Sequence, residues 1–389
     1  MKWFAVFLLF IGYSVTAQAQ VTDSCHLRIS LLTCSPGTEL YSTFGHTAIR
    51  VQNRSTGTDE VYNYGTFEFG PGFYTQFVRG KLRYFLSVER MDEFLYNYQY
   101  ENRSVVEQVL LLSCAEKARL HAALQANALE QNRYYKYDFL RDNCTTRAGN
   151  MIRITAVGDT TLNILPPAPL TFRNQIHEYL HRNKQWWSKF GIDLLLGMPL
   201  DKQVTNSEAQ FLPDYLLQAM ILRRVPSGPL VTAPLTVLPA QPQRSDEAIG
   251  PMPVFALLLL VVFIASFFKS KTSQRFLNWF DPFLFLVTGL VGMLLLFMWF
   301  GTDHAVCAYN LNLLWALPSH AIAVFFMRSQ QSWVRVYFLA SFAVCMLLLI
   351  GWAWLPQNLN EAVIPLVGCL ALRSYFMAQK NKTHVANTR

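Results

Sequence analysis

A cysteine that follows a helix-capping asparagine is the residue of this sequence best suited to nucleophilic chemistry. In residues 137–147, the pair Asp142-Asn143 directly precedes Cys144, and a run that can be helical follows over residues 145–154. Asn143 is a favourable N-cap, which predicts that Cys144 lies in the first turn of a helix. The positive end of the helix dipole would lower the pKa of the thiol there and favour the thiolate. The alternative is a buried structural cysteine or one half of a disulfide.

A nucleophilic thiol needs a base, and His46 is the candidate. The alternation and β-branched residues of the stretch 44–51 are typical of a strand that begins near His46. The next predicted strand, over residues 60–67, contains Asn63, which we expect to orient the imidazole ring as the third member of a Cys-His-polar set. Three neighbouring residues are alternatives for that third role: Tyr62, Tyr64 and Glu68. A structural role is the alternative for a histidine at a strand start.

The other cysteines offer one rival nucleophile. Four of the seven cysteines precede the apolar half of the chain: Cys25, Cys34, Cys114 and Cys144. Cys34 precedes a Pro-Gly turn and not a clear helix, so it lacks the dipole effect. If Cys144 is free, at most one disulfide forms among the remaining three. With no CxxC pair and no His/Cys cluster at metal-ligand spacing, the sequence predicts neither a metal nor another cofactor.

The elements that would position these residues follow an α+β order, in which strands come first and helices afterwards. Further strands are predicted over residues 27–33, 84–90 and 104–112. Helices are predicted over residues 115–131, 171–190, 191–198 and 207–223. The strands would form a small antiparallel sheet or barrel. We also expect the segments 199–201 and 211–213 to cover the thiol site.

The ends of the chain and its middle divide it into segments of different character. Residues 1–19 resemble a secretory signal peptide, with a charged start, a short apolar run and a small-x-small cleavage site. An exported domain would then occupy residues 20–224. Residues 225–251 are rich in proline and predict an extended linker. A transmembrane domain is expected over residues 252–378 and a cytoplasmic tail over residues 379–389.

The apolar half predicts five transmembrane helices, since 52% of the 389 residues are hydrophobic. The five apolar runs are residues 252–268, 281–300, 305–327, 336–354 and 360–378. Lys and Arg occur in the first and third connecting loops and in the tail, whereas loops 301–304 and 356–361 have none. The positive-inside rule then places the first domain in the periplasm and the C-terminus in the cytoplasm. The net charge of +8 is explained partly by these loops, so no nucleic-acid partner is expected.

Polar residues interrupt the third apolar run at its outer end. They are Asp303, His304, Asn310 and Asn312. Polar groups in a membrane span are costly and usually face the interior of a helix bundle. Their position at the leaflet surface predicts contacts to a lipid headgroup or an incoming amine, with His304 as a possible base for a second half-reaction. Hydrogen bonding between helices is the alternative.

Taken in order, these motifs resemble known thiol enzymes. The pattern His-x-Ala-Ile-x-Val from His46, followed later by Asn143-Cys144, resembles the circularly permuted papain-like enzymes of the NlpC/LRAT type. The whole chain is more similar still to the Lnb-type lipoprotein N-acyltransferase family. Five segments carry this resemblance: Leu32-Thr33-Cys34-Ser35-Pro36-Gly37, Phe44-Gly45-His46, Tyr62-Asn63-Tyr64-Gly65-Thr66-Phe67, Asp142-Asn143-Cys144-Thr145-Thr146 and Thr302-Asp303-His304.

The resemblance implies a permuted papain-like periplasmic domain followed by an all-α membrane domain in the bacterial inner membrane. It implies an acyl chain that moves from a phospholipid to Cys144 and then to the N-terminal cysteine amine of a diacylated lipoprotein. His46 would be the base and Asn63 its orienting partner. The partners would be the phospholipid donor, the lipoprotein acceptor and the bilayer. The alternatives are a membrane-bound NlpC-type cell-wall peptidase or amidase, and a non-catalytic envelope sensor or assembly protein.

Overall fold

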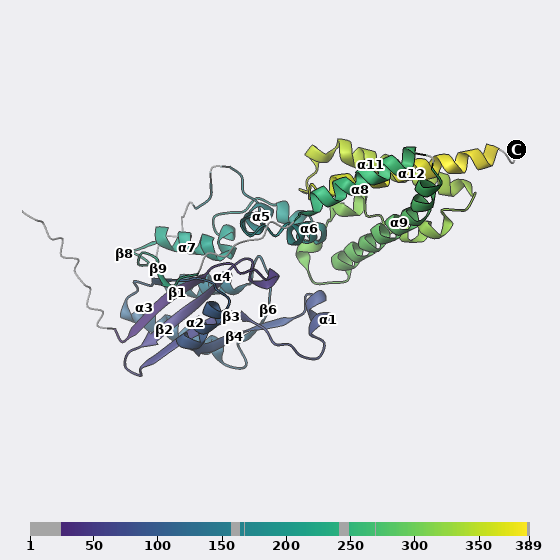
Figure 1. Ribbon diagram of the computed structural model, residues 1–389. Helices are drawn as coiled ribbons and strands as arrows, with labels where there is room; N and C mark the ends of the chain where they lie inside the picture. Colours follow the sequence, from purple (N-terminus) through teal and green to yellow (C-terminus); the bar gives the residue numbers. More distant parts are fainter. Residues whose placement is uncertain (1–24, 157–163, 167, 241–248, 269, 387–389) are drawn as a thin grey trace, which may run out of the picture.

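The computed structural model describes residues 25–156, 164–166, 168–240, 249–268 and 270–386, and the predicted signal peptide lies outside them. Figure 1 shows two parts next to each other. The N-terminal part is a sheet with helices around it, and the C-terminal part, from α8 onward, is helical. The α+β order of the first part and the helical character of the second agree with the sequence-based expectation.

A seven-stranded antiparallel sheet forms the centre of the N-terminal part, with the strand order β6-β4-β3-β2-β1-β5-β9. Its strands are β1 (Leu27–Cys34), β2 (His46–Asn53), β3 (Thr58–Thr66), β4 (Arg83–Arg90), β5 (Val105–Val109), β6 (Tyr134–Lys136) and β9 (Leu235–Leu238). The five strands expected from alternation are confirmed as β1 to β5, with ends shifted by a few residues. Short β6 and β9 occupy the two edges of the sheet.

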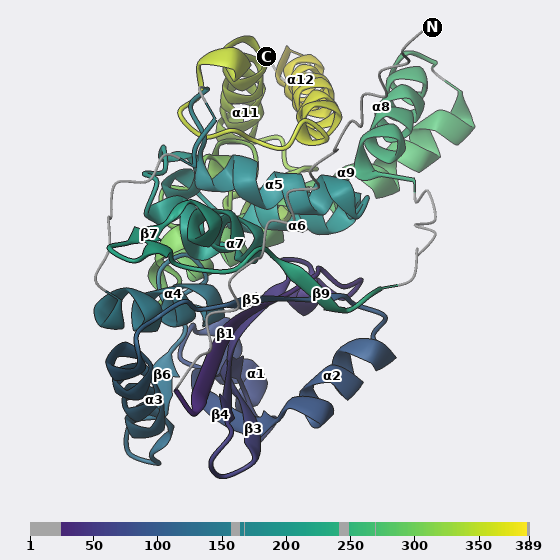
Figure 2. The ribbon, with the colours of Figure 1, turned by 90° about the vertical axis from the view of Figure 1, so that its left-hand side faces the viewer.

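Helices cover both faces of this sheet, and the alternation of side chains along β1 shows how. Ile29 and Leu31 pack into a core with α3 (Cys114–Ala128) and α4 (Cys144–Thr155). Leu32 and Cys34 point to the opposite face and pack against α2 (Met91–Tyr100). Because both faces are covered, six consecutive residues of β1 are buried. Figure 2 shows α3 and α2 on different sides of the strands.

Three more helices connect the sheet to the C-terminal part. They are α5 (Phe172–Arg182), α6 (Trp186–Leu195) and α7 (Pro213–Leu222), and the short 3-10 helices η2 (Met198–Asp201) and η3 (Glu208–Phe211) lie between α6 and α7. The sequence predicted these helices with approximate bounds but missed α2 and the short α1 (Phe73–Val78). α1 is preceded by Gly72 with φ +80°, and no side chain caps it, so it lacks the usual start signal.

The described first part of the predicted linker 225–251, up to residue 240, is more ordered than expected. It contains a small hairpin of β7 (Arg224–Val225) and β8 (Gly228–Pro229), and then β9, which pairs with β5. The four residues of β9 include β-branched Thr236 and Val237, and Pro234 and Pro239 flank them outside the strand. The prediction of a tether was wrong here because β5 would otherwise be an open sheet edge, and the segment completes it.

The C-terminal part contains four longer helices, α8 (Pro251–Phe267), α9 (Lys271–Phe300), α11 (Ser332–Ile350) and α12 (Val363–Ala386). Within the described residues, only α9 and α11 are both long and apolar enough to cross a membrane, and α8 and the apolar part of α12 are shorter. α12 also extends into the predicted cytoplasmic tail. Arg373 of α12 binds Asp281 of α9 through two buried hydrogen bonds of 2.6 and 2.8 Å.

The expectation of five continuous transmembrane helices is not confirmed, because the run 305–327 is broken. It forms only η4 (Ala305–Cys307), η5 (Leu311–Leu314), α10 (His320–Ala323) and η6 (Val324–Phe326). Side-chain bonding interrupts the helix, since Asn310 accepts the amide hydrogen of Asn312. The broken segment lies so close to α9 that a Cβ at Gly292 would fall 2.0 Å from the carbonyl oxygen of Ala316.

Candidate active site

The cysteine at the start of α4 is held by a well-formed helix cap. α4 begins at Cys144, and the side chain of Asn143 accepts the amide hydrogen of Thr146 at 2.9 Å. Asn143 also donates to the carbonyl oxygens of Phe139 (2.7 Å) and Phe211 (2.9 Å), which fixes the cap to the chain on either side. The predicted helix start is confirmed. The amides of Cys144 and Thr145 lie in the first turn, where no carbonyl within the helix can accept them.

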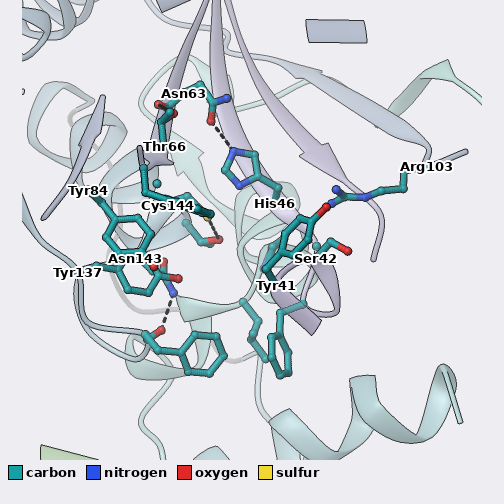
Figure 3. Close-up of a pocket in the computed structure, with 18 of the residues that line it drawn as sticks. Tyr41, Ser42, His46, Asn63, Thr66, Tyr84, Arg103, Tyr137, Asn143 and Cys144 are labelled. Carbon is teal, nitrogen blue, oxygen red and sulfur yellow. Dashed lines mark hydrogen bonds between the residues drawn. The ribbon is translucent and has the colours of Figure 1, made fainter. Parts of the chain in front are cut away.

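His46, the first residue of β2, lies between Cys144 and Asn63 (Figure 3). Its Nε2 is 2.6 Å from Asn63 Oδ1. Because an amide oxygen only accepts, Nε2 carries a proton, and Nδ1 remains for the hydrogen bond that His46 makes to Cys144. The structure therefore brings together the cysteine, the histidine and the asparagine that the sequence suggested.

A carboxylate behind Asn63 extends this set, and sequence reasoning missed it. Asn63 Nδ2 donates to Glu89 Oε1 at 2.7 Å, so the amide cannot turn over without losing both bonds. Glu89 lies on β4, the neighbour of β3 in the sheet. Its contact with Asn63 depends on strand register, which alternation within one strand does not reveal.

The three alternative third members lie elsewhere. Tyr62 packs against the ring of His121 at 6.4 Å, and Tyr64 packs against Tyr135 at 6.4 Å, both in the core shared with α3 and α4. Glu68 lines a separate surface cavity beside α1. Of the four candidates, Asn63 is the one hydrogen-bonded to His46 in the part of the chain that the structure describes.

The electrostatics of this pair favour a thiolate and an imidazolium. Burial by itself would raise the pKa of Cys144, but the charge and hydrogen bond of His46 and the Thr47 amide lower it to about 7. Burial likewise opposes the charged form of His46, yet the Cys144 thiolate raises the pKa of the imidazole above its ordinary value. The thiol is thus ionised to a large extent at neutral pH.

Gly65 lies beside this pair. It has φ +91°, at an irregularity in the pairing of β3 with β4. A Cβ at this position would lie 3.5 Å from the Cβ of Cys144 and 3.9 Å from Cε1 of His46. Both distances are ordinary van der Waals contacts, so the positive φ, and not a lack of space, is what favours glycine at this position.

Cys144 and His46 open into a cavity of about 670 Å³. Much of its lining is aromatic and includes Phe44, Phe67, Phe77, Tyr84, Tyr137, Phe139 and Phe211. The rings of Tyr84 and Tyr137 stack at 4.3 Å, and Figure 3 shows both on the same side as Cys144. Polar residues, among them Asn97, Glu101 and Arg103, line another part. A largely apolar cavity with a few polar groups is typical of a binding site for a small-molecule ligand.

The expected cover of the site is present in part. Residues 211–213 line the cavity as predicted, and Phe211 also accepts the hydrogen bond from Asn143 described above. The other expected segment, residues 199–201, has a different role. Its Asp201 binds the buried Arg173 at 2.9 Å, away from Cys144.

The four polar residues predicted at the outer end of the membrane domain contact the N-terminal part. Asp303 pairs with Lys136 of β6 at 2.8 Å, and His304 Nε2 lies 3.1 Å from the carbonyl oxygen of Phe77 in α1. Asn310 and Asn312 are buried and donate to backbone carbonyls of α6 at 2.8 to 3.2 Å. The structure places all four in the contact between the two parts and not in the cavity lining. Their predicted role in substrate binding stays a prediction.

Comparison with known protein families adds a finding to this geometry. The family model described as the Lnb N-terminal periplasmic domain matches residues 15–178, and the model described as the Lnb transmembrane domain matches residues 243–384. Together they span most of the chain, in the same order as the two structural parts. No curated protein and no solved structure matches the chain.

Proposed function

The chain belongs to the Lnb family, with a periplasmic domain and a transmembrane domain, and we propose that it is a cysteine-dependent lipoprotein N-acyltransferase. The observation that carries the proposal is the pairing of Cys144 with His46 at the wall of an aromatic cavity. The chain order His46, Asn63, Cys144, with the histidine on a strand and the cysteine at a helix start, supports a circularly permuted papain-like arrangement.

In the first half-reaction, the Cys144 thiolate attacks the ester carbonyl of a phospholipid. The new S–C bond forms a tetrahedral intermediate, and the first-turn amides of α4 are placed to stabilise its oxyanion. The ester C–O bond then breaks, and the imidazolium of His46 gives its proton to the leaving alcohol of the lysophospholipid. The products are an acyl-cysteine thioester and a neutral imidazole.

In the second half-reaction, the N-terminal cysteine amine of a diacylated lipoprotein attacks the thioester. His46 accepts a proton from the amine, the new amide C–N bond forms, and the S–C bond breaks to return the thiolate. Asn63, held by Glu89, keeps Nδ1 of His46 directed to the sulfur through both steps.

The aromatic cavity favours an acyl chain over a cell-wall peptide as the occupant. A peptidoglycan stem peptide is polar and charged, and its burial against phenyl and phenol rings would leave polar groups without partners. An acyl chain would gain free energy from the same burial. The proposed location is the inner membrane, with the Cys144 domain in the periplasm and the C-terminus in the cytoplasm.

The decisive test replaces each of the two rival cysteines in a host that depends on this protein for lipoprotein maturation. Cys144→Ser should abolish the third acyl chain, read as the mass of lipoprotein N-termini, while the protein remains in the membrane. Cys34→Ser is the matched control and should keep N-acylation. Full acylation by Cys144→Ser would overturn the acyl-cysteine mechanism. Release of muropeptides by the wild type, without N-acylation, would favour the amidase.

A further inference from the structure

The segment between β3 and β4 exposes several large apolar side chains. Phe69 is 75% exposed, Tyr74 is 76% exposed and Phe77 is 51% exposed, and Val78 beside them is 43% exposed. These residues belong to α1 and to the loop before it, residues 67–72. A cluster of exposed rings on one short segment marks a contact surface for an apolar partner.

The position of this segment is fixed against the membrane part. The amide of Asp303 donates to the carbonyl oxygen of Arg79 at 2.9 Å, and His304 contacts the carbonyl of Phe77. Gly80, with φ +67°, allows the His304 ring to approach, since a Cβ there would lie 3.2 Å from it. Both contacts come directly after the end of α9, so α1 lies beside the end of an apolar helix of 30 residues (Figure 1).

The end of α9 has the composition of a membrane–water boundary. Trp299 and Phe300 stack at 4.7 Å, and Trp299 also contacts the ring of Tyr309 at 5.1 Å. Phe300 is 73% exposed and Tyr309 is 62% exposed. Trp and Tyr concentrate at the interface of a bilayer because their rings are apolar and their N–H and O–H groups reach water. α1 therefore lies at the level of the outer leaflet.

A continuous line of rings runs from the exposed segment to the active site. Phe69 contacts Phe73 at 4.5 Å, and Phe73 stacks on Phe67 at 5.7 Å. Phe67 contacts Tyr84 at 5.4 Å, and Tyr84 stacks on Tyr137. Phe67, Tyr84 and Tyr137 all line the cavity that contains Cys144. Successive ring contacts thus link the exposed segment to the wall of the cavity that contains Cys144.

We propose that residues 67–78 insert into the outer leaflet of the membrane and that the line of rings guides one lipid acyl chain from the leaflet to Cys144. The insertion follows from the exposed rings and their level beside α9. The guidance of a substrate chain rests on the proposed function. On this proposal, the acyl donor is a lipid of the bilayer and is not delivered by a soluble carrier.

Photo-cross-linking tests the leaflet contact without relying on activity. The full chain is reconstituted into vesicles of labelled phosphatidylethanolamine and phosphatidylglycerol, with benzoylphenylalanine in place of Tyr74. The matched control carries it in place of Tyr100, which is 84% exposed. Tyr100 belongs to α2, and this helix lies farther from the C-terminal part than α1 does (Figure 1). We expect about fivefold or more lipid adducts at Tyr74. Equal yields, or an adduct only with another protein chain, would overturn the insertion.

A comparison of two acyl donors tests the guidance. Tyr74→Asp and Phe69→Asp place a charge on the exposed segment, and neither residue lines the cavity. Thioester formation on Cys144 from vesicle phospholipid should slow by about tenfold, because a charge opposes insertion. The rate from a monomeric short-chain ester should fall much less. Equal losses with both donors would overturn the guidance. If the wild type forms no thioester from either donor, the proposed function fails, and the cross-linking result still decides the leaflet contact.

Discussion

Two cysteines of the N-terminal domain, Cys34 and Cys144, lie close to the same histidine and yet have opposite chemical character. Cys34 is directly opposite His46 in the pairing of β1 with β2, and it is fully buried among apolar residues against α2. Burial raises the pKa of its thiol to about 12, and this effect outweighs the opposing hydrogen bond of Tyr98. Cys144 begins α4 and has a pKa of about 7.

The difference shows that the pKa of each thiol depends more on the direction of the His46 ring than on the distance to it. Burial raises the pKa of both thiols, but only Cys144 receives the hydrogen bond and positive charge of His46. Asn63 sets this direction, because it binds Nε2 and leaves Nδ1 for Cys144. The helix start adds the field of its free amides, which a cysteine within a strand does not have. The lowered pKa of the Cys144 thiol thus fits a position that combines the imidazole of His46 with the start of a helix.

The largest effect is expected for His46→Ala. The variant lacks both the base and the counter-charge, so acyl transfer should fall by about 10³- to 10⁴-fold. The thiol of wild-type Cys144 should react with iodoacetamide as the thiolate forms, with a midpoint near pH 7. In the variant, burial still raises the pKa and nothing at His46 lowers it, so the midpoint should move to higher pH. Peptide mapping of the alkylated protein across pH gives both values.

His121→Ala is the control for that experiment. His121 packs on Tyr62 in the core of the same domain, and burial lowers its pKa. Its removal should leave the Cys144 midpoint near pH 7. An unchanged midpoint in His46→Ala would show that the helix end alone ionises the thiol, and the comparison between the two cysteines would then need another cause.

Local signals in the sequence were sufficient to predict the helix start at Cys144, the proposed nucleophile, and the strands β1 to β5. Asn143 before an amphipathic run predicts the start of α4, and alternation predicts β1 to β5, because both signals depend on neighbours along the chain. Glu89 and the stacked pair Tyr84 and Tyr137 were not predicted. Glu89 and Tyr84 reach the site through the pairing of β4, and Tyr137 directly follows β6, which pairs with β4; no signal within one segment specifies that register.

In the C-terminal part, sequence patterns identified an apolar run but not its backbone structure. Hydropathy over a window identifies the apolar run 305–327 but not its broken backbone. Asn310 and Asn312 turn their side chains to backbone carbonyls of α6, and this use depends on a partner from the other part of the chain. The same holds for Asp303, whose contact with Lys136 joins residues 167 positions apart. Contacts between distant parts of the chain produce no periodic pattern in the sequence, so the sequence could not predict them.

A smaller effect is expected for Asn63→Ala, which tests how the ring is directed. Without the amide, the Nε2 proton loses its acceptor and the imidazole can rotate away from Cys144. Acyl transfer should fall by about 10- to 100-fold, mainly in kcat, and the Cys144 midpoint should rise. Glu89→Gln keeps an acceptor for Asn63 and should have a weaker effect in the same direction. A full rate in Asn63→Ala would mean that packing alone holds His46 in place.

The smallest effect on activity is expected for Cys34→Ala. The thiol of Cys34 has no part in the proposed reaction, so acyl transfer should stay within about twofold, whereas the loss of its packing and of the Tyr98 hydrogen bond should cost about 1 kcal/mol in the free energy of unfolding of the domain. A fall of about 2–4 °C in Tm, with the rate retained, would show this.

Native Cys34 should also stay unalkylated at pH 8 and react only after denaturation, because its thiol ionises far above that pH. Loss of transfer in Cys34→Ala at an unchanged Tm would assign chemistry to the buried cysteine. The contrast between the two thiols would then be one of access to the cavity and not of ionisation.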